Sequence, residues 1–259
     1  MKHVLWTGGW DSTYRVLDLL LIKHETVQTH YIIDSDRKST QMELHTMQQI
    51  RSTVIARYPE TESRFLPLIT FERSAIPANA EITENFRVIT NRAYAGTQYD
   101  WLCRYARHAG VDGMDLCVER STDRRNNHIY NVLHCSGDII PVSDGNDFYY
   151  ALKPNPAHPE LQMFRDVRFP LLDKSKHQLE QAAIEGGFAD LLETTWFCHN
   201  PGKDGKPCGV CHPCQSVRME GLGRRLPPLT LRNRITLTKM WLVNYLNDLR
   251  RAAKNKHHA

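Results

Sequence analysis

The sequence predicts an α/β protein with a doubly wound, mostly parallel sheet, followed by a small cysteine-rich unit and a terminal helix. Segments with strand-like and helix-like patterns alternate through the first two thirds of the 259 residues. Such alternation is typical of a parallel sheet with helices on both faces. Four cysteines then fall within residues 198–214, at the spacing that a closed, tetrahedral zinc site requires.

The first four elements follow from the periodicity of apolar residues. Short apolar strands are predicted at Val4–Trp6 and Val27–Ile33. Helices are predicted at Ser12–Lys23 and Thr40–Arg57, because their apolar residues recur every three or four positions. Two strand–helix pairs in succession indicate the start of a parallel sheet.

The middle of the chain has a less regular pattern. A third strand is predicted at Phe65–Phe71, where Pro67 weakens the signal. Glu72–Asn91 has few periodic apolar positions and is predicted to be a loop or lid. A long helix at Arg92–His108 and a strand at Met114–Glu119 are expected to follow.

The last third combines irregular and regular segments. Pro141–Arg168, rich in Asp, Asn, Pro and aromatic residues, is predicted to form an insertion or a strand pair over the active cleft. Ser175–Glu185 is predicted to be a helix, since Ser175 and Gln178 form a capping box. An amphipathic helix is expected at Arg234–Arg251, where it packs on the core or on a second subunit, so a homodimer is a candidate assembly.

Composition limits the classes of function. The net charge of +4 suits phosphorylated ligands, but it is too small to indicate nucleic-acid binding by itself.

The sequence shows neither a signal-peptide pattern nor an apolar run that could span a membrane, and seven cysteines suit a reducing compartment. We therefore expect a cytoplasmic protein with no membrane partner, divided into an α/β domain (1–190), a zinc knot (191–225) and a terminal helix with a basic tail (226–259).

Residues Thr7–Thr13, which we call the Gly-Gly loop, join the first strand to the first helix in the order Thr-Gly-Gly-Trp-Asp-Ser-Thr. Two glycines let the backbone bend so that successive N–H groups approach an anion, and the positive end of the following helix points at the same place. The loop lacks the Gly-x4-Gly-Lys-Ser/Thr pattern of the common triphosphate cradle. A plain strand-to-helix turn is the alternative interpretation.

The Gly-Gly loop resembles the Ser-Gly-Gly-x-Asp-Ser-Thr pyrophosphate loop of the N-type ATP pyrophosphatases, with Thr7 in place of serine. Cys198, Cys208, Cys211 and Cys214 resemble the zinc knot of one branch of that superfamily, the 7-cyano-7-deazaguanine synthases of queuosine biosynthesis. The two motifs stand in the same order as in that family. The resemblance implies a Rossmann-like fold of the adenine nucleotide α-hydrolase type.

The resemblance also implies site residues. Residues expected to bind ATP are Thr7, Gly8, Gly9, Asp11, Ser12, Thr13 and Asp34. Asp11, acting through Mg²⁺, Ser12 and Lys174, which would offset phosphate charge, are the candidate catalytic residues. Candidate substrate contacts are Arg37, Arg92, Glu119 and Asp123. The zinc ion would be structural, because four cysteine ligands leave no open position.

The reaction implied is an AMP-forming C–N ligation. ATP would adenylate 7-carboxy-7-deazaguanine, and ammonia would displace AMP to give the amide. A second ATP would then activate the amide oxygen, and loss of AMP would give 7-cyano-7-deazaguanine. Thr90–Ala93 departs from the Pro-Gly-Arg-Asn stretch of the family, and the terminal helix is extra, so the product stays open.

Three alternatives remain. An antiphage-defence relative would join the activated deazaguanine to an amine of a partner protein. A zinc-knuckle module would bind nucleic acid. A pyrophosphatase relative would thiolate or amidate another substrate.

Overall fold

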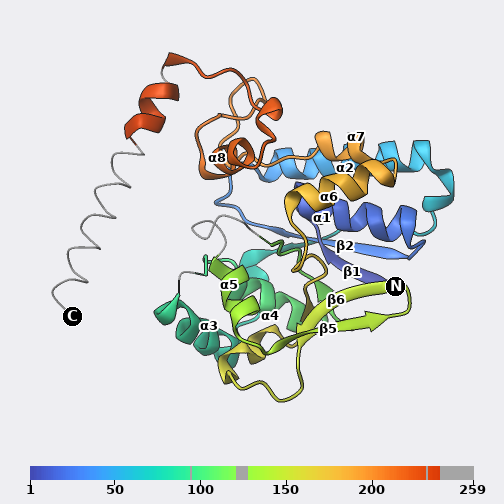
Figure 1. Cartoon of the computed structure of the whole chain (residues 1–259), viewed down its shortest axis with the longest axis vertical. Helices are drawn as coiled ribbons and strands as arrows, with labels where there is room; N and C mark the ends of the chain where they lie inside the picture. Colours follow the sequence, from blue (N-terminus) through green and yellow to red (C-terminus); the bar gives the residue numbers. More distant parts are fainter. Residues whose placement is uncertain (94, 121–127, 232, 240–259) are drawn as a thin grey trace. The chain divides into compact units, whose positions relative to one another are not determined.

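The computed structural model describes residues 1–93, 95–120, 128–231 and 233–239, and divides the chain into two compact units, Met1–Trp196 and Phe197–Ala259 (Figure 1). None of the helices in this described part combines the length and the apolar character that crossing a membrane requires. Each unit is considered by itself below.

A five-stranded, wholly parallel sheet forms the centre of the first unit, in the order β3-β2-β1-β4-β7. Its strands are β1 (Lys2–Leu5), β2 (Val27–Ile33), β3 (Ile69–Glu72), β4 (Met114–Asp115) and β7 (Val167–Arg168). The order reverses between β1 and β4. Parallel α/β sheets bind ligands outside the carboxyl ends of the strands at such a switch point.

Helices cover both faces of the sheet, as the sequence predicts (Figure 1). One face carries α1 (Trp10–Leu17), α2 (Thr40–Arg57), α6 (Lys176–Glu185) and α7 (Ala189–Glu193). The other carries α3 (Ala80–Arg92), α4 (Tyr99–Ala109) and α5 (His128–Cys135). A π-helix at Asp18–Ile22 continues α1, and short 3-10 helices occupy Pro59–Thr61, Arg73–Ala75 and Pro159–Phe164.

Two predictions for the middle of the chain are wrong. Glu72–Asn91 is not a loop, because α3 fills most of it and begins where the Asn79 side chain accepts a hydrogen bond from the Ile82 N–H. Ile82 and Ile89 of this helix are buried. The predicted helix from Arg92 to His108 is instead broken, since α3 ends at Arg92 and α4 starts only at Tyr99.

The strand pair predicted within Pro141–Arg168 is present as the antiparallel hairpin β5 (Ile139–Asp144) and β6 (Asp147–Leu152). Its turn lies away from the Gly-Gly loop. Lys2, the first residue of β1, donates to Asp144 at 2.7 Å, whereas the Gly-Gly loop follows the other end of β1. The turn of the hairpin therefore lies at the amino edge of the sheet.

A buried ionic cluster fastens this hairpin to α1. The guanidinium of Arg15 donates to both carboxylate oxygens of Asp147 at 2.8 and 2.7 Å, and to Asp115 of β4 at 2.7 Å. Each of the three residues is at most 2 % exposed. The two carboxylates carry one more charge than the Arg15 guanidinium balances. This excess negative charge explains why the ammonium groups of Lys2 and Lys23 lie 3.3 and 3.8 Å from Asp147.

The second unit contains α8 (His212–Met219) and a 3-10 helix at Gly223–Arg225. The predicted helix at Arg234–Arg251 falls only partly within the described residues, and 233–239 are helical. Within this unit the Arg225 guanidinium lies over the Phe197 ring, 4.9 Å from its centroid.

Candidate active site and metal centre

The Gly-Gly loop connects the carboxyl end of β1 to α1, and its backbone requires glycine. Gly8 has a φ of +68°, which side chains of L-residues rarely adopt. A Cβ atom there would lie 3.1 Å from Met47 Cγ and 3.3 Å from the Glu43 carbonyl oxygen of α2. Gly8 is therefore pressed against α2, and the loop has little freedom to change shape.

Hydrogen bonds between residues within and next to the Gly-Gly loop hold its conformation. The Trp6 indole N–H donates to the Thr13 hydroxyl at 2.9 Å, and both residues are buried. The Ser12 hydroxyl accepts from the Thr7 N–H at 3.4 Å and lies 3.5 Å from the Gly9 carbonyl oxygen. The hydroxyl of Thr13 thus faces Trp6 in the interior, while Thr7 is exposed.

Lys176, the first residue of α6, brings the loop and the end of β4 together. Its ammonium forms an ion pair with Asp11 of the Gly-Gly loop and a second with Glu119 at 3.2 Å. The side chains of Lys176, Glu119 and Asp11 are 14, 14 and 28 % exposed. We call these three residues the Lys176 cluster. It lies at the β1–β4 switch point, where an anionic ligand is expected.

Lys176 was not among the predicted site residues, whereas Lys174 was. Lys174 is 40 % exposed, and its ammonium lies 3.7 Å from Asp173. The signal that could have identified Lys176 is the capping box, which is present with Ser175 as N-cap. It fixes residue 176 as the first helical residue, at the end of α6 that faces the carboxyl edge of the sheet.

Other predicted residues occupy the same edge of the sheet but have partners of their own. Asp34, directly after β2, accepts from Arg73 at 2.6 Å. Arg37 lies 3.3 Å from the buried carboxylate of Glu43. Arg73 follows β3 and was not predicted, because a lone arginine after a weak strand carries no sequence signal.

The remaining predicted substrate contacts differ in their placement. Arg92 ends α3, on the sheet face opposite α1, and forms an ion pair with Glu160 while 66 % exposed. Asp123 lies outside the described residues. Of the three predicted substrate contacts that the structure describes, only Glu119 joins the Lys176 cluster.

The four cysteines of the second unit meet at one point. Their sulfur atoms all lie within 4.8 Å of one another. Cys198 and Cys211 are 3.8 Å apart, and Cys208 and Cys214 are 3.9 Å apart. A tetrahedral zinc ion with Zn–S bonds of about 2.3 Å requires sulfur–sulfur separations of roughly 3.8 Å. Cys211 and Cys214 are 3.4 Å apart, so the four sulfur atoms come close to this geometry and need only small shifts to hold zinc.

Backbone amides support the same cysteine cluster. The Cys208 N–H donates to Cys198 Sγ at 3.2 Å, and the Cys211 N–H donates to Cys208 Sγ at 3.3 Å. Such bonds stabilise thiolates, which are the metal-binding form of cysteine. Gly209, with a φ of +74°, makes the turn between them. This is the arrangement of a closed, structural site.

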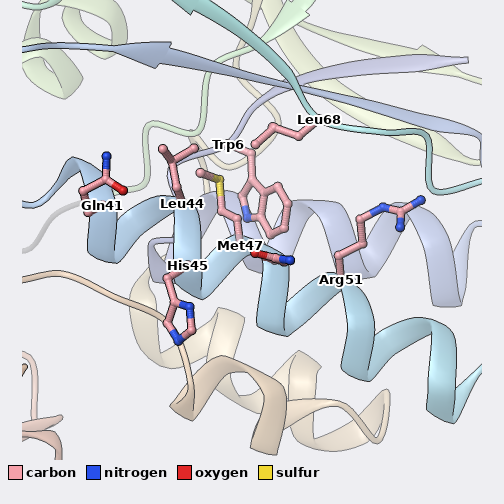
Figure 2. A pocket seen from close by; sticks show the side chains of 8 residues that line it. Trp6, Gln41, Leu44, His45, Met47, Arg51 and Leu68 are labelled. Atoms are coloured by element: carbon pink, nitrogen blue, oxygen red, sulfur yellow. The ribbon is translucent and has the colours of Figure 1, made fainter.

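A pocket of about 430 Å³ lies beside α2 (Figure 2). Trp6, Leu44, Met47 and Leu68 supply its apolar wall, and polar side chains of α2 line the rest: Gln41, His45, Gln48 and Arg51. Trp6 therefore lines this pocket and also donates to Thr13 of the Gly-Gly loop. The pocket has one cation and no carboxylate, in contrast to the Lys176 cluster.

Comparison with known families gives one match. Residues 150–225 match the family model described as queuosine biosynthesis protein QueC. Over these residues the match supports the predicted resemblance to the 7-cyano-7-deazaguanine synthase family. The QueC match contains Lys176 and all four cysteines, spans less than a third of the chain, and leaves the Gly-Gly loop outside. A search of curated proteins finds no match to the chain.

Proposed function

We propose that the chain uses ATP to adenylate 7-carboxy-7-deazaguanine and converts the adenylate to the amide or to 7-cyano-7-deazaguanine, with release of AMP and pyrophosphate. One observation carries the proposal. Lys176, within the QueC match, forms ion pairs with Asp11 of the Gly-Gly loop and with Glu119 beyond β4. One cation thus links two segments of the switch-point edge, where the nucleotide phosphates would bind.

In the first step a carboxylate oxygen of the substrate attacks the α-phosphorus of ATP. The bond from that phosphorus to the β-phosphate oxygen breaks, and pyrophosphate leaves. The backbone of Gly8 and Gly9 and the N-terminus of α1 would bind the pyrophosphate, and Ser12 would donate its hydroxyl. Lys176 would leave its carboxylates and offset the charge that develops on the leaving group.

In the second step ammonia attacks the acyl carbon, loses a proton, and expels AMP, which keeps one former carboxylate oxygen. A second ATP can then activate the amide oxygen, and loss of AMP and two protons gives the nitrile. Neither step needs a nucleophilic side chain. Holding the carboxylate in line with the phosphorus is the main task of the protein.

The residues also fit the two metal ions of the proposal. Asp11 and Glu119 both lie within ion-pair distance of one lysine ammonium, so they present carboxylate oxygens, the ligands that Mg²⁺ prefers, to a common point. A magnesium ion bound there would supply positive charge against the phosphate oxygens. Zinc on the four cysteines would hold the second unit folded and take no part in the reaction.

The acceptor of the adenylate is open in this proposal. A protein amine would replace ammonia in a chain that acts in antiphage defence, and it would attack the same acyl carbon. The departure from the family at Thr90–Ala93 supports this variant, because Arg92 is engaged by Glu160 at the surface. Both variants share the first step, so the product distinguishes them.

We propose nucleic-acid binding by the second unit as a second candidate function, favoured by its charge. Residues 197–259 contain 12 Lys and Arg against 3 Asp and Glu, whereas residues 1–196 contain 21 against 26. Strong basic charge confined to one unit is the usual footprint of a phosphate-backbone contact. Fluorescence anisotropy with labelled RNA and DNA at several salt concentrations tests it, and affinity independent of salt contradicts it.

Mass spectrometry of the reaction products tests the main proposal. Zinc-loaded protein is incubated with ATP, Mg²⁺, ammonium and 7-carboxy-7-deazaguanine, with Asp11→Ala as the inactive control. Amide or nitrile together with AMP and pyrophosphate supports the proposal with ammonia as acceptor. An adenylate that accumulates despite ammonium supports a protein acceptor. No AMP release under any condition contradicts the proposed function.

A further inference from the structure

The Gly8–Gly9 peptide of the Gly-Gly loop has a backbone partner from a distant part of the chain. The Trp196 N–H donates to the Gly8 carbonyl oxygen at 2.8 Å. A trans peptide unit is planar, so its C=O and N–H groups point in opposite directions. Whatever fixes the Gly8 carbonyl therefore also fixes the direction of the Gly9 N–H.

The same peptide is held at its two ends. On one side, the Gly8 Cα lies against Met47 and the carbonyl of Glu43. On the other, the Gly9 carbonyl accepts from the Thr13 N–H at 3.0 Å in the first turn of α1. Together with the bond from Trp196, these contacts set the plane of the peptide. Within the described residues, the Gly9 N–H makes no hydrogen bond that would compete with a ligand.

Trp196 follows a segment that is anchored in the first unit. The preceding Thr195 is 4 % exposed, and its hydroxyl donates to the Leu192 carbonyl at 2.6 Å, next to the end of α7. The residue before the positioning N–H is therefore held in place by the end of α7.

We infer that the backbone N–H of Trp196 is a positioning group of the ATP site. It holds the Gly8–Gly9 peptide with its N–H directed toward the phosphates before ATP arrives, so that the loop need not reorganise on binding. The inference deepens the proposed function and rests on it, because it assigns phosphate as the ligand of the Gly9 N–H. The side chain of Trp196 has no part in this role.

The test replaces the Trp196 amide by an ester, using the α-hydroxy analogue of tryptophan, which removes the N–H and keeps the side chain. Trp196→Phe is the matched control, since it keeps the N–H and changes the side chain. Affinity for Mg–pyrophosphate and for ATP is measured by calorimetry, and kcat and KM are measured separately. The ester should lose about fivefold to tenfold in affinity for both ligands, the contribution of one hydrogen bond, with kcat changed less than KM.

The controls separate this inference from the proposed function. Trp196→Phe should bind pyrophosphate within twofold of wild type, and the ester should keep one zinc ion and a wild-type thermal unfolding midpoint within a few degrees. An ester protein that binds pyrophosphate as wild type does overturns the inference. Wild-type protein that binds pyrophosphate tightly but forms no AMP from the carboxylate overturns the proposed function alone. Wild-type protein that binds neither ligand overturns both.

Discussion

Arg15 with Asp147 and Asp115, which we call the Arg15 cluster, has the same composition type as the Lys176 cluster. Each cluster places one cation between two carboxylates, and the two lie at opposite edges of the sheet. At the amino edge, Arg15 gives three hydrogen bonds to Asp147 and Asp115, in a site from which water is excluded. At the carboxyl edge, Lys176 meets Asp11 and Glu119 while all three remain partly exposed. The two cations carry the same charge. They differ in how completely their donors are engaged by carboxylates and shielded from water.

That difference separates a structural cluster from an exchangeable one. The Arg15 guanidinium and the nearby lysines hold the pKa of Asp147 at about 2 against the opposing effect of burial, and the Arg15 pKa is raised above its usual range by the same carboxylates. A guanidinium is a rigid fork, and each of its three nitrogen atoms donates to a carboxylate here. The lysine ammonium is a point charge on a flexible chain, and phosphate oxygens can replace its carboxylates.

Removing Asp147 should give the largest effect. Asp147→Ala leaves the buried guanidinium without its bidentate partner, and we expect the free energy of unfolding to fall by about 3–5 kcal/mol. Urea unfolding followed by circular dichroism measures the loss. The exposed Asp204→Ala is the control and should change stability little. A loss below 1 kcal/mol for Asp147→Ala would contradict the structural role of the Arg15 cluster, because both clusters would then contribute little to stability.

The His3–His30–Tyr105 chain sharpens the comparison, because its two imidazoles are packed together without a carboxylate. His30 lies 3.0 Å from His3 and 2.7 Å from the Tyr105 hydroxyl, and burial lowers its pKa to about 4. As the pH falls, the unfolded chain binds the proton first, near pH 6.5. Stability from this site is therefore present above pH 6.5 and lost toward pH 4, by up to about 3 kcal/mol. Denaturant unfolding at several pH values measures it, and His30→Gln should flatten the slope. An unchanged slope in that variant contradicts the assignment.

At the carboxyl edge we expect the opposite pattern, a loss of chemistry with little loss of stability. Lys176→Met should lower kcat/KM for AMP release about a hundredfold, as removal of one charge-stabilising donor does. The unfolding free energy should fall less than in Asp147→Ala, because the side chains of Lys176, Asp11 and Glu119 keep partial access to water. Lys174→Met is the matched control and should keep activity within threefold. A larger loss of kcat/KM in Lys174→Met than in Lys176→Met would instead support Lys174 as the catalytic lysine, as the sequence predicted.

The smallest expected effect concerns the cap that places Lys176. Ser175→Ala removes the acceptor for the Gln178 N–H and should cost about 1 kcal/mol of stability. If the cap orients Lys176, KM for ATP should rise severalfold while kcat changes less. Ser175→Asp, which keeps an N-cap acceptor, should restore KM. Steady-state kinetics of the two variants measures this, and equal KM values in wild type and Ser175→Ala exclude an orienting role.

The sequence was sufficient where the signal is local. β2 and α2 start and end where the apolar period predicted, at Val27–Ile33 and Thr40–Arg57. The four cysteines were identifiable because metal ligands of one knot lie close together in sequence. The helix α3 was not predicted because few of its residues are apolar. Its buried residues, Ile82 and Ile89, stand among polar neighbours and give no clear helical period.

Long-range partners could not be predicted in the same way. Asp147 is 132 positions from Arg15, and Lys176 is 165 positions from Asp11, so their pairing depends on how the sheet is assembled. Lys174 and Lys176 are two positions apart, which decides whether a lysine precedes the cap or starts the helix. The bond between Trp196 and Gly8 involves backbone atoms only, and side-chain patterns carry no information about it.

The most direct test of the central claim follows an oxygen atom. 7-Carboxy-7-deazaguanine labelled with ¹⁸O in its carboxylate is incubated with the protein, ATP, Mg²⁺ and ammonium, and the AMP is analysed by mass spectrometry. Attack of the carboxylate on the α-phosphorus predicts AMP that carries one ¹⁸O atom, with none in the pyrophosphate. Unlabelled AMP, or no AMP, would contradict adenylation of the substrate at the Gly-Gly loop.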